Sequence, residues 1–283
     1  EMFGGEGMLR PAMHYRWNFD EVNLDFILQQ FGLFALPQVP PGERRDMALH
    51  AAGRMRKAAV AFGVTPETAP DIEAAYHDTM AELDAHFAAH PYLLGGAPTI
   101  GDYGLFAALY PHLGRDPHPL RLMQKKAQML LRWTERMRNP SADMVEFIGR
   151  DESLLGDDAI PKTLKVLLAR VASDYLPEIE AMMAFTNDWL AENNPEPNEV
   201  VGGESLARGI GMCEFNWRGL NINAVVMPYR IFMLQRIQDA CDALEVPARE
   251  AVDELLSETG LSTLVTSRCS RRVERENHRE IWR

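Results

Sequence analysis

The stretch that decides the fold runs from residue 90 to residue 106 and reads HPYLLGGAPTIGDYGLF. A helix is expected to end at His90-Pro91, and a Gly-Gly turn follows. Thr99 and Asp102 then have the spacing of a capping box. In such a box the Thr99 side chain accepts from the backbone N–H of Asp102, and the Asp102 carboxylate accepts from the N–H of Thr99. The pair therefore predicts a helix that begins beside Thr99.

The apolar pattern on both sides of this cap predicts an almost entirely helical chain. Ile100, Tyr103, Phe106, Ala107 and Tyr110 follow the cap at helical spacing. The helices are predicted at about residues 16–32, 43–62, 70–89, 99–113, 120–138, 161–193, 225–244 and 249–258. The helix at 161–193 is expected to be interrupted at Leu176-Pro177.

The rest of the pattern supports an all-α fold. Glycines in the segments 200–203 and 207–212 are compatible with one small β-hairpin. No alternation of strands and helices indicates a parallel sheet. The segment Asn139-Pro140-Ser141 ends the helix predicted at 120–138 and suggests a domain limit. We expect a helical domain over residues 1–140 and a helical extension, packed on it, over residues 141–283.

Composition and charge exclude several classes of function. The formal net charge of −12 argues against nucleic acid and against anionic membrane surfaces as partners. No apolar run approaches the roughly 20 residues that a membrane helix needs, and no secretory signal is visible. The three cysteines have no metal-ligand spacing, which favours reduced thiols in a cytoplasmic protein.

The opening segment from Met13 to Asp20 gathers residues that suit a binding pocket. Arg16 can pair with a carboxylate, while tyrosine and tryptophan suit a wall that is half apolar. The alternative is a structural helix whose aromatic residues fill the core and whose Arg16 pairs with Asp20 four residues later. The residue types favour this structural alternative.

Three other patterns favour ordinary structural roles. His86 and His90 are four residues apart, but no acidic residue completes a metal motif, so surface histidines near a helix end are expected. The glycines at 202–211 match no phosphate-binding fingerprint. Residues 268–283 carry six arginines and three glutamates. A solvated tail or helix is favoured there over docking on an acidic surface or an anionic ligand.

The phrase around Thr99 and Asp102, together with Trp133 and Met137, resembles the C-terminal helical domain of the glutathione transferases, in an extended bacterial form. The family commonly reads Leu-x-Gly-x-x-x-Thr-x-Ala-Asp, and Gly101 here replaces the alanine. The resemblance covers about residues 1–140. It implies that the Thr99–Asp102 pair is structural and caps the central buried helix.

The resemblance also implies a pocket for a small apolar electrophile, lined from the first helix and from the capped helix. Its candidate residues are Met13, His14, Arg16, Trp17, Tyr103 and Phe106. In the family, the catalytic residue and the groups that hold glutathione lie in an N-terminal thioredoxin-like domain. No matching βαβ pattern occurs in this sequence, so no catalytic residue is assigned. Glutathione as cofactor and a homodimer as assembly follow from the resemblance alone, and no metal is expected.

Two classes of function remain open. The first is the C-terminal part of a glutathione transferase-like enzyme that orients an electrophile. The second is a non-catalytic helical module for ligand binding or assembly, for which the 15 methionines would provide a permissive apolar site. The sequence starts at Glu1 rather than at a methionine, so we expect that the natural N-terminus is missing. We expect this chain by itself to be inactive towards glutathione and a generic aryl halide.

Overall fold

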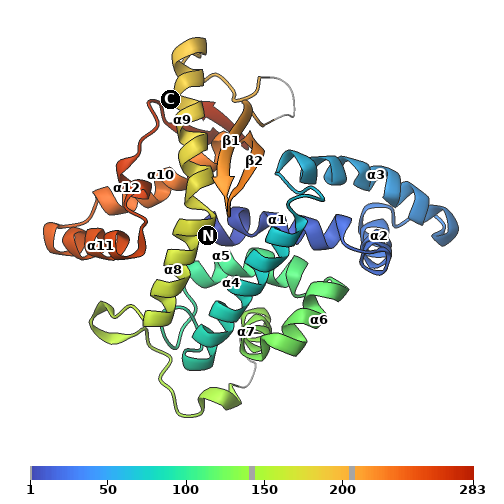
Figure 1. The fold of residues 1–283 in the computed structure, drawn as a ribbon, viewed down its shortest axis with the longest axis horizontal. Helices are drawn as coiled ribbons and strands as arrows, with labels where there is room; N and C mark the ends of the chain where they lie inside the picture. Colours follow the sequence, from blue (N-terminus) through green and yellow to red (C-terminus); the bar gives the residue numbers. More distant parts are fainter. Residues whose placement is uncertain (1, 140–143, 204–207) are drawn as a thin grey trace. The chain divides into compact units, whose positions relative to one another are not determined.

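The computed structural model describes residues 2–139, 144–203 and 208–283. Its chain contacts divide the protein into two compact units, Phe3–Leu167 and Leu168–Arg283. The limit predicted near residue 140 lies among residues outside the described ones, so the predicted domain division stays a prediction. Each unit is described by itself, with the elements labelled as in Figure 1.

In its described residues the first unit contains helices joined by loops, with two isolated β-bridges and no strand. Its elements are η1 (Phe3–Gly7), α1 (Leu9–Met13), η2 (His14–Asn18), α2 (Glu21–Ala35), α3 (Pro41–Ala61), α4 (Ala69–Ala89), α5 (Ile100–Ala108), η3 (Leu109–Leu113), α6 (Pro117–Lys126), α7 (Gln128–Arg138), η4 (Val145–Phe147), η5 (Gly156–Asp158) and the first part of α8 (Lys162–Asp174).

The prediction that the first helix begins near Arg16 is wrong, because α2 begins at Glu21. Asp20 is extended, with φ −148° and ψ 166°, and its Oδ1 accepts from the backbone N–H of Asn23 at 2.6 Å. An aspartate in this position satisfies one of the free N–H groups at a helix start. The residues before it form short helical turns rather than an extension of α2.

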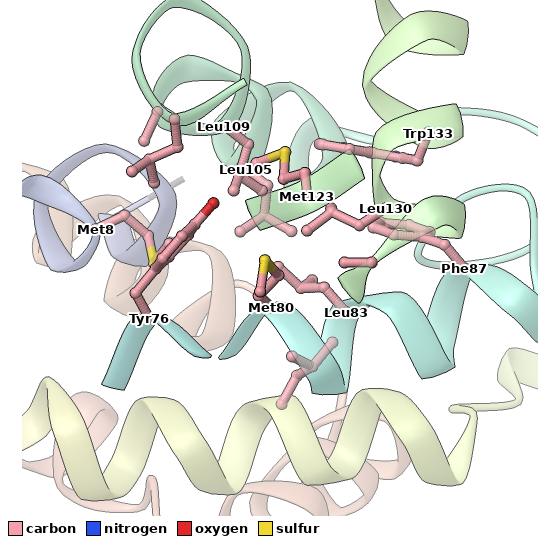
Figure 2. Packing of buried hydrophobic residues seen from close by; sticks show 14 of the residues in the cluster. Met8, Tyr76, Met80, Leu83, Phe87, Leu105, Leu109, Met123, Leu130 and Trp133 are labelled. Carbon is pink, nitrogen blue, oxygen red and sulfur yellow. The ribbon is translucent and has the colours of Figure 1, made fainter. Parts of the chain in front are cut away.

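The core of the first unit lies between α4 and the later helices. One face of α4 is buried through Tyr76, Met80, Leu83 and Phe87. Figure 2 shows these side chains meeting Leu105, Leu109, Met123, Leu130 and Trp133 from α5, η3, α6 and α7. The rings of Phe87 and Trp133 are stacked, with centroids 4.7 Å apart. The four-residue apolar spacing of α4 therefore builds the core that it predicts.

The Thr99–Asp102 capping box is present at the start of α5. Asp102 is completely buried, and both of its carboxylate oxygens are occupied. Oδ2 accepts from the backbone N–H of Thr99 at 2.9 Å and from its hydroxyl at 2.8 Å. Oδ1 accepts from the N–H of Leu93 at 3.0 Å and from Nε1 of Trp133 at 3.1 Å. This carboxylate thus ties the start of α5 to the preceding loop and to α7.

The helix predicted over residues 120–138 is two helices, separated at Ala127. The backbone of Ala127 leaves the helical region, with φ −146° and ψ 66°. Asp84 on α4 explains the break, because its Oδ1 accepts from the N–H groups of Met129 at 2.7 Å and Leu130 at 3.0 Å. A side chain 45 residues earlier in the chain thus caps α7.

The second unit combines helices with two small antiparallel sheets. Its elements are the remainder of α8, α9 (Leu176–Asn193), β1 (Gly211–Trp217), β2 (Leu220–Val226), α10 (Pro228–Asp242), α11 (Val246–Thr259), α12 (Thr263–Thr266), β3 (Val273–Glu276) and β4 (Arg279–Trp282). As predicted, the α-helical hydrogen-bond pattern is interrupted just before Pro177. Gly260, with φ 76°, ends α11.

The first hairpin lies downstream of the predicted one. Strands β1 and β2 pair over residues 211–226, whereas the predicted hairpin lay within residues 200–212. Residues 204–207 lie outside the described part of the chain. Arg218 and Gly219 form the turn with φ 52° and 84°. Two positive φ values are what a two-residue hairpin turn requires. Cys213, Phe215 and Trp217 alternate into the buried side.

The favoured prediction for the arginine-rich tail is wrong, because residues 273–282 form a second hairpin that joins β3 to β4. The tail docks on acidic residues of its own unit. Arg272 makes two hydrogen bonds with Asp239 on α10, at 2.9 and 2.7 Å, and Arg268 bonds Asp242 at 2.8 Å. These pairs are exposed, so each contributes little to stability.

The all-α class is confirmed, with twelve α-helices and two two-stranded sheets in the described residues. The three cysteines are free thiols. Across the described ranges, no helix is both long enough and apolar enough to cross a membrane.

Candidate ligand pocket

The candidate pocket is built on a small satellite core in the first unit. Trp17 of η2 packs against Ile27 and Leu28 of α2 and against Ala48 and Ala52 of α3. Because alanine has a small side chain, α3 approaches α2 and the tryptophan ring closely. This packing places η2 beside the middle of α3.

Between these elements lies a pocket of about 580 Å³. Its walls come from η2, the start of α2, the end of α3 and the turn into α4. The apolar lining residues are Trp17, Phe19, Leu24, Val60, Val64, Pro66 and Ala69. The polar lining residues are His14, Asn18, Asp20, Glu21, Arg56 and Thr65. Apolar and polar residues thus share the lining about equally, so the pocket offers both contact surface and hydrogen-bonding groups to a small organic molecule.

The turn into α4 is locally determined. Gly63 has φ 81°, a conformation that suits glycine. The hydroxyl of Thr68 donates to the carbonyl of Gly63 at 2.7 Å, while the N–H of Thr65 donates to the same hydroxyl at 3.0 Å. This turn fixes Val64 and Thr65 at the pocket wall.

His14 is the buried polar group of the pocket, and α4 orients it. Its Nε2 lies 3.0 Å from Oε1 of Glu73. The ring of His14 contacts the rings of Tyr15 and Phe19, with centroids 5.1 and 5.6 Å away, and Tyr15 is in turn stacked on His118 at 5.5 Å. The imidazole of His14 is thus held between a carboxylate and aromatic rings, which fixes its direction at the pocket.

Burial dominates the electrostatics of this aromatic cluster. It raises the pKa of Tyr15, and the nearby Glu73 carboxylate raises it further. Burial also lowers the pKa of His118, against the opposing effect of Asp20. Both groups are therefore neutral near pH 7. The Tyr15 hydroxyl finds no hydrogen-bond partner among the described residues.

The structure places the predicted pocket residues in different surroundings. His14 and Trp17 line the candidate pocket. Met13 packs against the satellite core. Tyr103 is 60% exposed and lines a second, smaller pocket, while Phe106 is stacked on Tyr110 at 4.8 Å. Their role with a ligand stays a prediction.

Arg16 does not form the predicted pair with Asp20. Its Nε and Nη2 each donate to the carboxylate of Asp116 at 2.9 Å, and Nη2 also donates to the carbonyl of Pro111. Asp20 instead caps α2. The partner of Arg16 lies 100 residues away in sequence, so the spacing of residues around Arg16 could not predict this pair.

His86 is not the surface residue that the sequence predicted, because it is fully buried. Its Nδ1 lies 2.8 Å from Oγ1 of Thr163 and its Nε2 lies 3.3 Å from the carbonyl of Tyr92. Both ring nitrogens therefore make contacts within the folded chain. In the part of the chain that the structure describes, no cluster of three or more His, Cys, Asp or Glu is placed to hold a metal ion.

Sequence reasoning missed Glu73, Arg56, Val60 and Thr65. Residues 63–66 fall between the helices predicted at 43–62 and 70–89, and nothing in their sequence indicates a pocket wall. Glu73 gave no signal, because its partner His14 is 59 residues away. These residues meet only through tertiary packing.

Comparison with known proteins supports the resemblance seen in the sequence. Residues 58–136 match the family described as "Glutathione S-transferase, C-terminal domain". The matched segment starts inside α3, contains the capped helix α5 and ends in α7. The resemblance is therefore confirmed for this segment. No curated protein and no solved structure matched the chain significantly.

Proposed function

We propose that this chain is the C-terminal part of a cytoplasmic glutathione transferase-like protein and that its 580 Å³ pocket holds a small apolar electrophile. The main support for the proposal is a pocket that apolar and polar residues line together. Part of this lining belongs to the segment that matches the family. Homodimerisation, as the resemblance implies, belongs to the same proposal.

The lining residues suggest how this domain contributes to conjugation. The apolar walls formed by Trp17, Val60 and Val64 remove water from an electrophile and position it. His14, held by Glu73, offers a polar group of fixed direction to a substituent of the substrate. We assign no described residue to glutathione itself, because the family binds it through a separate thioredoxin-like domain.

The test fills the pocket by a substitution on its rim. Val60 is 57% exposed, so Val60→Trp is expected to fold normally while its indole occupies the pocket. Binding of 1,3-dinitrobenzene, an unreactive analogue of an aryl halide, is measured by isothermal titration calorimetry. We expect at least tenfold weaker binding to Val60→Trp than to the wild-type chain.

The control is Val246→Trp, a valine of similar exposure in the other unit. It should bind as the wild type does. If Val60→Trp has a normal circular dichroism spectrum and binds 1,3-dinitrobenzene as tightly as the wild type, the electrophile does not bind in this pocket. Separately, the chain alone should not turn over glutathione with an aryl halide. Saturable turnover would show that the thiol chemistry does not need a separate domain.

A further inference from the structure

The two ring nitrogens of His14 have different surroundings. Nε2 lies 3.0 Å from Oε1 of Glu73 on α4. An ionised carboxylate accepts hydrogen bonds and donates none, so in the neutral imidazole the proton lies on Nε2. Nδ1 then keeps its lone pair and can only accept. Glu73 thus determines that the other side of the His14 ring presents a hydrogen-bond acceptor.

This acceptor is open to a ligand. The His14 side chain is 6% exposed and lines the 580 Å³ pocket. Within the described part of the chain, Nδ1 has no hydrogen-bond partner. It is also not among the unpaired polar atoms that the fold seals from solvent, unlike Oη of the neighbouring Tyr15. Nδ1 is therefore available to a molecule that enters the pocket.

The packing around His14 fixes the direction of this acceptor. The rings of Tyr15 and Phe19 contact the imidazole, and Phe19 meets it edge-on at 86°. A rotation of the imidazole would break these contacts together with the hydrogen bond to Glu73. An acceptor that is already oriented before binding costs little conformational entropy when a ligand uses it.

The charges of the lining decide which kind of donor fits. Asp20 and Glu21 bring two carboxylates to the pocket, and these oppose an anionic ligand. Arg56 is the one arginine or lysine among the described lining residues, and it opposes a cation. A ligand with an uncharged donor avoids both repulsions.

We propose that Nδ1 of His14, oriented through Glu73, selects an electrophile that carries an uncharged O–H or N–H donor on its apolar body. The donor bonds Nδ1, and the body packs against the apolar wall that includes Trp17 and Val64. An analogue without the donor leaves this acceptor unpaired when it displaces water from the pocket, which lowers its affinity. The inference rests on the function proposed above, because it specifies the ligand of the same pocket.

The ligand class is tested by isothermal titration calorimetry on the full chain at about pH 8, above the usual titration range of histidine. 3,5-Dinitrobenzyl alcohol carries the donor, its methyl ether keeps only the oxygen, and 3,5-dinitrotoluene has neither. We expect the alcohol to bind at least tenfold more tightly than either of the other probes. Equal binding of the alcohol and either other probe would overturn this inference but not the proposed pocket. If none of the three bound, the proposed function would fail as well.

The positioning role of Glu73 is tested with Glu73→Gln. An amide can donate as well as accept, so it no longer fixes the proton on Nε2. The preference for the alcohol over 3,5-dinitrotoluene should fall several-fold, while the affinity for 3,5-dinitrotoluene stays unchanged. Glu82→Gln removes the same charge further along α4 and should keep the full preference. An equal loss of affinity for all three probes would show that Glu73 only supports the fold, and an unchanged preference would show that it does not orient His14.

Nitrogen-15 NMR of the histidine rings reports the tautomer directly. The signals of His14 are identified by their absence in His14→Gln. We expect the ring proton on Nε2 in the wild type and a mixture of both tautomers in Glu73→Gln. A wild-type chain with the proton on Nδ1 would overturn the proposal, because that nitrogen would then donate to the pocket.

Discussion

Two buried carboxylates, Asp102 in the first unit and Glu178 in the second, are kept out of water by different means. Asp102 accepts four hydrogen bonds from uncharged donors. Glu178 is 1% exposed and forms an ion pair with Arg230, which is 2% exposed. The first arrangement distributes the negative charge over several local dipoles, whereas the second neutralises it with a full positive charge.

The difference between the two sites lies in how far apart their partners are in sequence. Most donors to Asp102 are near in sequence, with Thr99 three residues away and Leu93 nine residues away, while Trp133 is 31 residues away. Arg230 lies 52 residues from Glu178. A carboxylate that is satisfied locally leaves a readable motif, while a carboxylate that is satisfied by a distant cation leaves none. Breaking the ion pair should also cost more, because it leaves a buried charge without its counter-charge.

The largest effect is expected from Arg230→Met. It leaves Glu178 buried without its cation, which costs about 3–5 kcal/mol in the free energy of unfolding. Replacing both partners, as in Glu178→Leu with Arg230→Met, should recover most of that loss. Urea unfolding followed by circular dichroism measures both, with the exposed Arg236→Met on the same helix as a near-neutral control. A double variant as unstable as the single one would contradict this account.

Asp102→Asn should cost about 2–3 kcal/mol, because it presents an amide NH₂ to a site that contains only donors and removes the charge that strengthens their hydrogen bonds. The measurement is the midpoint of urea unfolding, with the exposed Asp46→Asn as matched control. A loss below about 0.5 kcal/mol, the usual range of a surface substitution, would show that the four hydrogen bonds do not stabilise the fold.

Trp133→Phe should cost about 1–2 kcal/mol, since it removes one hydrogen bond to Asp102 and some buried volume but keeps a ring stacked on Phe87. Combined with Asp102→Asn, its effect should be less than additive, because both changes remove the same contact. Thermal unfolding of the two single variants and the double variant gives the coupling. Strict additivity would mean that the indole N–H and Asp102 are energetically independent.

The smallest effect is expected from Thr99→Ala, at about 0.5–1 kcal/mol. The backbone N–H of residue 99 would still donate to Asp102, so only the hydroxyl contribution is lost. Thr99→Ser, which keeps the hydroxyl, should retain nearly all of the stability. If Ser and Ala were equally destabilising, the methyl group rather than the hydrogen bond would be responsible.

The sequence predicted most helices because their information is local. The helices at 70–89 and 249–258 appear as α4 (Ala69–Ala89) and α11 (Val246–Thr259). Their apolar spacing, prolines and glycine caps act within a few residues. The break at Ala127 was not predictable in the same way, because the carboxylate that causes it belongs to Asp84 on another helix.

The candidate site was predictable only in part. His14 and Trp17 were selected because their residue types suit a pocket, and the structure places both in one lining. Glu73 and Val60, which face the same region from α4 and α3, carry no distinguishing signal in a single sequence. Tyr103 was grouped with His14 from the resemblance and lies at a different pocket, beside Arg136.

The sequence by itself determined the helical class, the cap of α5 and the resemblance to a glutathione transferase C-terminal domain, because these depend on residues within about one or two helical turns. Only the tertiary structure decided which side chains complete each cap, which charges are paired and which residues share a pocket. Those contacts join positions tens of residues apart. Their selection depends on the summed packing of several helices, and no single stretch of sequence contains that sum.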